Sequence, residues 1–244
     1  MKKITIVLAC LIAGSGVLAQ AKRHDSTAIA LLDRMSDIIG GLESCSYRLH
    51  TAVDMTDTLN MLVKEFSDYH VYMSGPDKML INAHGRRGHH QMMYNGSQLS
   101  YYSFDEHNYG LLSAPPTTLQ MIDTMNNRFG IEFPAADFFY PAFTDDLLED
   151  ADTVRFLGKS EIDGKEYFDI LAIGKKMNYQ IWLSNDEFLL PARFLITYKN
   201  QPGSPQYFAV FSDWQINPVL PSAMFDFTPP PGARQVYMMA KGER

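Results

Sequence analysis

The chain has 244 residues, of which 28 are Asp or Glu and 21 are Lys or Arg, and its formal net charge at pH 7 is −7. This acidic balance argues against a nucleic acid or an anionic membrane surface as the partner, because both attract a positively charged footprint. The length is sufficient for one sizeable domain with its own hydrophobic core.

The first 19 residues have the pattern of a secretory signal peptide. Lys2 and Lys3 form a positive n-region, the residues from Ile4 to Val17 are almost all apolar, and small residues surround Ala19. The apolar run is too short for a membrane span. We therefore expect cleavage after Ala19, with Ala21 as the alternative, and a mature chain that is soluble in the periplasm or otherwise exported.

A lipid anchor at Cys10 is the alternative to simple cleavage. The run Val7-Leu8-Ala9-Cys10 resembles a lipobox, which would leave the protein tethered to a membrane. Only six residues separate Lys3 from Cys10, fewer than the roughly 7–15 of a usual h-region. We favour cleavage, which leaves Cys45 as the single cysteine of the mature chain. Without a second cysteine it forms no intramolecular disulfide, and we expect a small buried apolar side chain there.

The first half of the mature chain is predicted to be one helix followed by strands. Apolar residues recur every three or four positions from Ser26 to Ser44, which is typical of an amphipathic helix. The period then changes to the alternation of strands, and Asn95-Gly96 marks a tight hairpin turn. We expect strands over 47–56, 62–73, 78–83, 90–94, 99–104 and 109–112.

The second half is predicted to contain two helical stretches and a second run of strands. Thr117 or Thr118 caps a helix that ends near Phe129, and a third helical stretch runs from Ala135 to Leu148 with a break near Pro141. We expect further strands over 154–162, 166–173, 179–183, 192–198 and 206–214, and a polar tail over 237–244 whose last residues, Lys241 to Arg244, are frayed.

This order of elements predicts an α+β fold in a single domain over 22–236. A sheet of roughly ten or more antiparallel strands curls into a barrel or half-barrel. We therefore expect a large curved antiparallel sheet, an incomplete β-barrel, with about three helices covering its concave face.

Alternation within the strands indicates which side chains face the concave side. Several strands have one strongly apolar face and one mixed face, so the apolar face needs a cover. Between the helices and this face lies an apolar space, which either admits a ligand or is filled by side chains as an ordinary core. Alternation alone also allows the opposite assignment, in which the other face of each strand is the concave one. The predicted lining residues are Val154, Phe156, Phe168, Ile170, Ile181, Leu183, Phe194 and Ile196 from strands, with Ile122, Met125, Phe138 and Phe139 from the helical lid.

No motif in the chain predicts an enzyme, and we expect no catalytic residues, no metal and no cofactor. The sequence contains no Gly-x-Ser-x-Gly elbow, no His-Glu-x-x-His pair and no phosphate-binding glycine loop. The segment from His84 to His90 holds three histidines, but its glycines suit a solvated loop and Arg86 and Arg87 would repel a cation.

Several segments resemble the DUF2092 family of predicted periplasmic proteins. They are Leu32-Asp33-Arg34-Met35, Met92-Met93-Tyr94-Asn95-Gly96, Pro202-Gly203-Ser204-Pro205-Gln206-Tyr207, Phe211-Ser212-Asp213-Trp214 and Phe225-Asp226-Phe227-Thr228-Pro229-Pro230. That family is similar to the lipoprotein carriers LolA, LolB and LppX. The resemblance implies a LolA-like half-barrel, whose concavity in the carriers shields acyl chains.

These expectations combine into one functional hypothesis and one alternative. The first is a non-enzymatic exported protein that holds a lipid, a lipoprotein acyl chain or another hydrophobic small molecule in the periplasm. The alternative is a cell-envelope sensor or protein-interaction module with a filled core, whose partner is an envelope protein.

Overall fold

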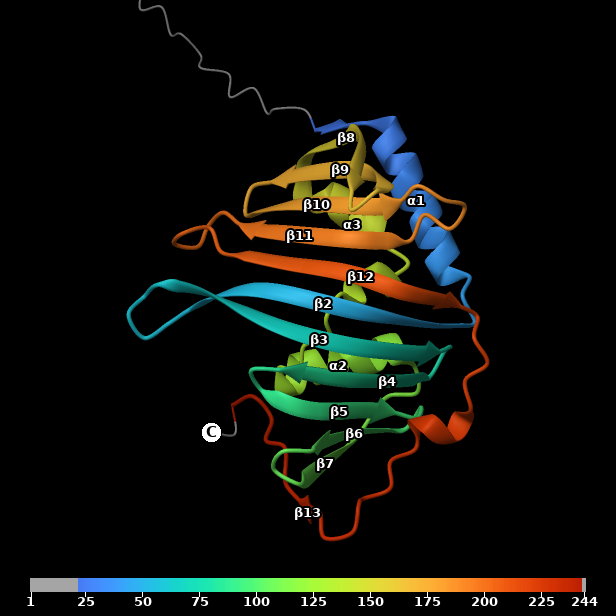
Figure 1. The fold of residues 1–244 in the computed structure, drawn as a ribbon, viewed down its shortest axis with the longest axis vertical. Coiled ribbons are helices and arrows are strands. Elements are labelled where there is room, and N and C mark those ends of the chain that lie inside the picture. Colours follow the sequence, from blue (N-terminus) through green and yellow to red (C-terminus); the bar gives the residue numbers. More distant parts are fainter. Residues whose placement is uncertain (1–21, 243–244) are drawn as a thin grey trace, which may run out of the picture.

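The computed structural model describes residues 22–242, so the expected signal peptide over 1–19 and the alternative anchor at Cys10 lie outside the described residues. The described chain forms a 13-stranded sheet in the order β1-β8-β9-β10-β11-β12-β2-β3-β4-β5-β6-β7-β13 (Figure 1). The strands are β1 (Arg23–His24), β2 (Ser44–Thr56), β3 (Leu62–Ser74), β4 (Lys78–Gly85), β5 (Gly88–Tyr94), β6 (Gln98–Ser103), β7 (Asn108–Ser113), β8 (Ala151–Ile162), β9 (Lys165–Gly174), β10 (Met177–Ser184), β11 (Pro191–Tyr198), β12 (Gln206–Ile216) and β13 (Arg234–Gln235).

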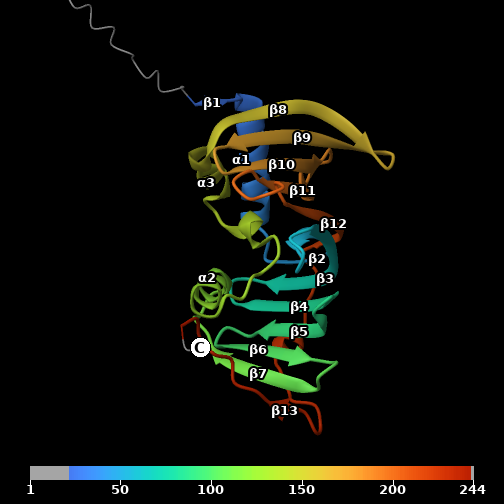
Figure 2. The same ribbon diagram turned by 90° about the vertical axis from the view of Figure 1, so that its left-hand side faces the viewer.

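The sheet consists of two antiparallel meanders joined in the middle. Strands β2 to β7 form one meander and β8 to β12 the other, and β12 pairs with β2 in antiparallel register. The two-residue strands β1 and β13 pair in parallel with β8 and β7 at the two edges. The sheet is therefore strongly curved but open, and the predicted incomplete barrel is confirmed (Figure 2).

Helices cover the concave side of this sheet, as predicted (Figure 2). Helix α1 spans Ser26–Gly40 and is capped by Asp25, whose Oδ1 accepts a 2.7 Å hydrogen bond from the Thr27 amide. Helix α2 spans Thr118–Phe129 after its cap Thr117. The predicted third helical stretch consists of two short elements, the 3₁₀ turn η1 (Ala136–Phe139) and helix α3 (Phe143–Asp150). No helix among residues 22–242 is long and apolar enough to span a membrane.

The main hydrophobic core fills most of the space between these helices and the sheet. Phe138 of η1 is 1% exposed, and its ring contacts those of Phe143, Phe194 and Phe211 at centroid distances of 4.8, 5.1 and 5.6 Å. This aromatic cluster joins the lid to the sheet. Cys45 is a free, buried thiol in the same core, as expected, and burial raises its pKa to about 12.

A smaller core lies on the convex face of the sheet. Leu80 of β4 and Met93 of β5 pack there against Phe225, which belongs to the 3₁₀ turn η2 (Ser222–Phe225). The chain then continues along the sheet to β13. The segment after β12 therefore covers part of the convex face of β4 and β5.

Two local expectations were wrong. The segment from His84 to His90 is not a loop, because β4 and β5 extend to Gly85 and Gly88 and leave only Arg86-Arg87 as the turn. The C-terminal tail is held in place at Lys241 and is not frayed there. Lys241 donates from its amide to the Arg128 carbonyl at 2.7 Å and from Nζ to the Asn126 carbonyl at 2.8 Å. The acceptors are carbonyls of the last turn of α2, where that of Asn126 also accepts a 2.9 Å hydrogen bond from the Gly130 amide.

Candidate ligand-binding cleft

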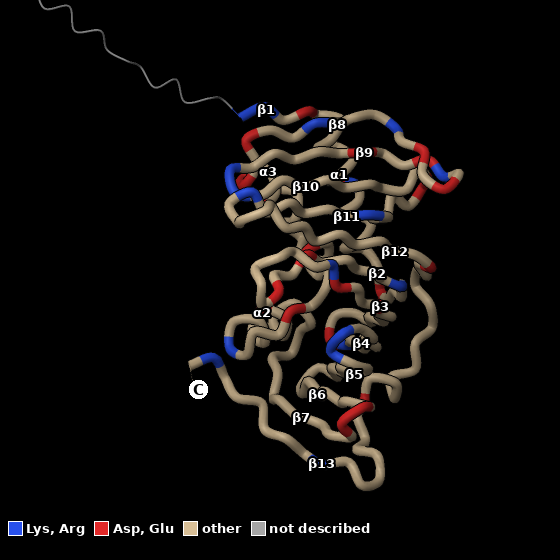
Figure 3. The backbone as a smooth tube through the Cα atoms, turned by 60° about the vertical axis from the view of Figure 1, so that its left-hand side comes forward, with Lys and Arg blue, Asp and Glu red and all other residues tan. Residues whose placement is uncertain are grey.

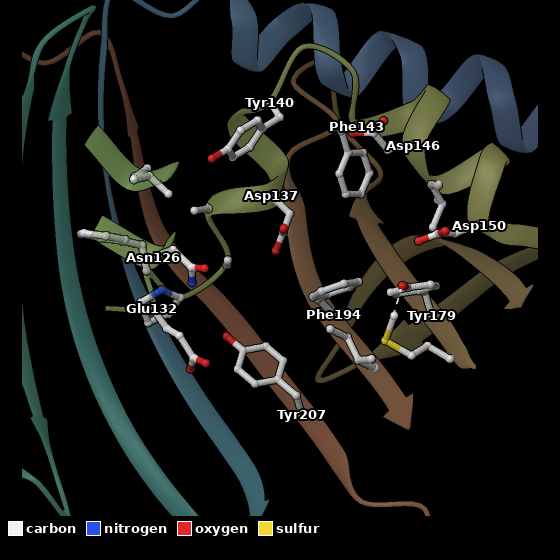
Figure 4. Close-up of a pocket in the computed structure, with 18 of the residues that line it drawn as sticks. Asn126, Glu132, Asp137, Tyr140, Phe143, Asp146, Asp150, Tyr179, Phe194 and Tyr207 are labelled. Carbon is white, nitrogen blue, oxygen red and sulfur yellow. Dashed lines mark hydrogen bonds between the residues drawn. The ribbon is translucent and has the colours of Figure 1, made fainter. Parts of the chain in front are cut away.

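A cleft of about 670 Å³ lies between the helical lid and strands β10 to β12 (Figure 4). Its walls come from three parts of the chain: α2 with the segment after it, η1 with α3, and the concave side of the three strands. The lining residues are Ile122, Asp123, Asn126, Asn127, Glu132, Phe133, Pro134, Ala135, Ala136, Asp137, Tyr140, Phe143, Asp146, Leu147, Asp150, Met177, Tyr179, Phe194, Ile196, Tyr198 and Tyr207.

The floor of the cleft is a cross-strand row of large side chains. Tyr179 of β10 is directly opposite Ile196 of β11, which is in turn opposite Tyr207 of β12. Phe194 lies two residues from Ile196 on the same face, and its ring is nearly parallel to that of Tyr179 at a centroid distance of 6.2 Å. Because alternate residues of a strand share a face, the register brings these rings together without help from a loop.

The segment between α2 and α3 forms the roof. Gly130 ends α2 in the left-handed region at φ 71°, and Ala135 adopts φ 57° immediately before η1. This bend directs Phe138 into the core while its neighbour Asp137 points into the cleft (Figure 4). Tyr140 lies at the rim, where its hydroxyl donates a 2.7 Å hydrogen bond to Asp123 Oδ1.

The polar lining is acidic. Five carboxylates line the cleft, and no Lys or Arg of residues 22–242 lines it; the acidic residues are Asp123, Glu132, Asp137, Asp146 and Asp150. Acidic positions occur on both of its helical walls (Figure 3). Desolvation raises the pKa of Asp137. An anion in the cleft would therefore meet a negative potential, whereas a cation or a hydrogen-bond donor would meet acceptors.

Tyr207 is a polar group within the apolar floor. Its hydroxyl is buried and has no hydrogen-bond partner within residues 22–242, and burial, followed by nearby tyrosines and acids, raises its pKa. A buried hydroxyl without a partner costs about 1–3 kcal/mol. A ligand with a polar group at this point would relieve that cost.

The structure places all twelve predicted lining residues on the concave side, but it divides them between cleft and core. Ile122, Phe194 and Ile196 line the cleft. The other nine pack in the hydrophobic core, six of them buried and three partly buried: Met125, Phe138, Val154, Ile170, Ile181, Leu183, Phe139, Phe156 and Phe168. Most of these predicted lining residues therefore fill the concavity with side chains, and three of them face the cleft between the lid and β10 to β12.

Sequence reasoning missed the three strand tyrosines that line the cleft, Tyr179, Tyr198 and Tyr207, and all of the acidic lining. Tyr179 and Tyr207 have the strand parity of Ile181 and Ala209, so the alternation that selected Ile181 also pointed to them. The carboxylates come from helix surfaces and a bent loop, where periodicity gives no direction. In sequence, such acidic positions are typical of solvated surfaces.

Comparisons with known proteins agree with this architecture. The model of the DUF2092 family, described as a predicted periplasmic protein, matches residues 28–239. Among solved structures, the chain is similar to an uncharacterized conserved protein from Thermus thermophilus, with 10% identity over 86% of this chain and 99% of that chain and a TM-score of 0.50. At this identity the likeness concerns the fold alone.

Two further structures are similar over a comparable length. They are the Mycobacterium tuberculosis lipoprotein LppX (15% identity, 81% of this chain and 99% of that chain, TM-score 0.47) and the LolA superfamily protein NE2245 from Nitrosomonas europaea (12%, 82% and 97%, TM-score 0.42). No curated protein matches the chain in sequence.

Proposed function

The chain belongs to the DUF2092 family of predicted periplasmic proteins, and on that premise we propose that it is a non-enzymatic, exported protein that holds a lipid, an acyl chain or another hydrophobic ligand. The observation that carries the proposal is the open cleft with an apolar and aromatic floor on the concave side of the half-barrel. Soluble proteins bind small apolar ligands in concave sites of this kind, with a few polar groups that fix orientation.

The size of the cleft supports a ligand of one acyl chain or less. Its volume of about 670 Å³ lies within the roughly 300–1,000 Å³ of typical ligand sites. Burying eight methylene groups at about 0.8 kcal/mol each supplies roughly 6 kcal/mol before ordering costs are subtracted.

The acidic lining limits the kinds of ligand headgroup that the cleft can hold. Because the described part of the chain contributes five carboxylates and no basic side chain to the lining, a ligand carboxylate or phosphate inside the cleft is repelled. A unit charge 4 Å away contributes about 1 kcal/mol in water and about 4 kcal/mol near a protein surface. We therefore propose a neutral or cationic headgroup, such as an alcohol, an ester or an amine.

Binding of the neutral dye N-phenyl-1-naphthylamine to the protein without residues 1–19 tests the site. Ile196→Asp places a charge on the floor and should weaken dye binding at least tenfold. The matched control is Leu195→Asp, because Leu195 has the same size and neighbouring position but the opposite strand parity. Equal binding by wild type and a folded Ile196→Asp variant would exclude this cleft as the site.

Competition by amphiphiles of one chain length then tests the headgroup. Dodecanol and dodecylamine should displace the dye at lower concentration than dodecanoate, with dodecylamine and dodecanoate kept below their critical micelle concentrations and dodecanol below its solubility limit. The difference in displacing concentration between dodecanoate and the other two amphiphiles should shrink at high salt, because salt screens charges near the surface. Displacement by dodecanoate at the lowest concentration would contradict the neutral or cationic headgroup, although not the cleft itself.

A protein-interaction module is the second candidate, and the ribbon of β2 and β3 favours it. This hairpin extends beyond its neighbours in Figure 1, and its end exposes large apolar side chains: Met55, Leu59, Met61, Leu62, Val63 and Phe66. Exposed apolar patches of this kind are typical of interaction sites. Replacing Leu59 and Met61 by serine should abolish capture of an envelope protein by this module and leave dye binding unchanged. If an envelope protein still bound to the variant with both substitutions, the ribbon would not be its binding site.

A further inference from the structure

The convex face of the sheet carries a row of polar side chains in strict cross-strand register. His50 of β2 is opposite Asp68 of β3, Asp68 is opposite His84 of β4, and His84 is opposite His89 of β5. With His70, these side chains line a groove of about 260 Å³ on the side of the sheet opposite the cleft. Four of the seven histidines of the chain line this groove.

Within the row, His84 and His89 have the spacing of a chelating pair. Their ring centroids are 5.9 Å apart and their planes are inclined at 59°. If each nitrogen lies about 2.0–2.1 Å from one tetrahedral metal ion, the two ring centroids are roughly 5.2 Å apart. The imidazoles therefore need to approach by less than about 1 Å, a movement within the rotamer freedom of the exposed His84.

The surroundings hold one ring in place and leave the other free. His89 stacks on Phe104 with a centroid distance of 4.0 Å and an inclination of 11°. Its backbone amide donates a 2.7 Å hydrogen bond to Asp105 Oδ2. His84 has no hydrogen bond to another side chain among those described between residues 22 and 242. One fixed and one adjustable imidazole suit a metal ion whose remaining coordination positions are occupied by water.

The charges around the pair favour a cation more than the sequence indicated. Arg86, which the sequence places beside the histidines, forms an ion pair with Glu65. Asp68 accepts a 2.8 Å hydrogen bond from His50 through Oδ1, which leaves Oδ2 for another partner. Together with Asp105, these groups offset the turn residue Arg87. Within residues 22–242 no group of three or more acidic, histidine or cysteine side chains converges on one point, so the ion would have two protein ligands.

We propose that His84 and His89 bind a divalent transition-metal ion, such as Zn²⁺, on the convex face of the sheet. Two imidazoles supply borderline ligands that such ions prefer over the oxygen donors selected by Ca²⁺ and Mg²⁺. The site is separate from the cleft, so the proposal does not depend on the hydrophobic ligand.

Isothermal titration of Zn²⁺ into the protein without residues 1–19 and without an affinity tag tests the site. His84→Gln and His89→Gln should each weaken binding at least tenfold, and the effects should not add, because either change leaves a single ligand. His50→Gln is the matched control from the same row and should change affinity less than threefold. Circular dichroism melting checks that each variant folds. Loss of affinity in His50→Gln alone, unchanged affinity in the double variant His84→Gln/His89→Gln, or no saturable binding to wild type would each overturn the proposal.

Discussion

Replacing Phe138 by alanine should destabilise the protein more than any exposed Phe→Ala change. The ring is 1% exposed and lies among those of Phe143, Phe194 and Phe211. Removing it deletes a fully buried aromatic side chain and leaves a cavity between lid and sheet. Phe→Ala changes in such places cost about 3–5 kcal/mol. For a domain of this size, that corresponds to a fall in Tm of roughly 6–20 °C.

Urea unfolding followed by circular dichroism measures the effect as a change in midpoint at constant slope. Phe66→Ala is the matched control, because the Phe66 side chain is 56% exposed on the β2–β3 ribbon, and its loss should cost less than about 1 kcal/mol. If Phe138→Ala cost no more than Phe66→Ala, the aromatic cluster would not join the lid to the sheet.

Three further predictions concern a buried thiol, a helix cap and the C-terminal segment. Burial raises the pKa of Cys45 from 9.0 to about 12, so the folded state retains a proton that the unfolded chain releases. Stability is therefore intact below pH 9 and falls by up to about 1.4 kcal/mol per pH unit between pH 9 and 12. Cys45→Ala should flatten this decline, and a thiol reagent at pH 8 should react only in urea. Thr117→Ala should cost about 1 kcal/mol through loss of the α2 cap, with Thr117→Ser as the conservative control; equal unfolding midpoints would exclude that cap. Removal of residues 236–244 should speed amide exchange at the end of α2, because Lys241 no longer occupies its carbonyls; unchanged exchange would show that the tail contributes nothing there.

The fold was predictable because simple periodicities determine most of it. Each of the eleven long strands was expected within a few residues, since alternation and turn residues such as Asn95-Gly96 mark them strongly. Strand order was not predictable beyond neighbouring hairpins. The β12–β2 pairing joins segments far apart in the sequence, and no local pattern encodes it.

The histidine segment shows how a correct observation led to a wrong structure. Gly85 and Gly88 flank Arg86-Arg87, and clustered glycines usually indicate a loop. Here Gly88 adopts φ 85° next to a two-residue turn, and both strands continue up to it. The glycine therefore permits a tight hairpin, which puts His84 directly opposite His89. The loop interpretation concealed the one arrangement in which two of these histidines meet.

The candidate cleft was less predictable than the sheet because it depends on what the lid leaves uncovered. Strand parity identifies every residue that faces inward, but it does not distinguish a side chain under a helix from one beside it. Ile170 and Ile196 have equivalent positions in their strands, yet Ile170 is fully buried in the core while Ile196 faces open space. The bend at Ala135 packs Phe138 onto Phe194 and Phe211 and leaves its neighbour Asp137 facing the cleft. The same bend therefore positions both the aromatic contacts that join the lid to the sheet and one of the acidic side chains that line the cleft.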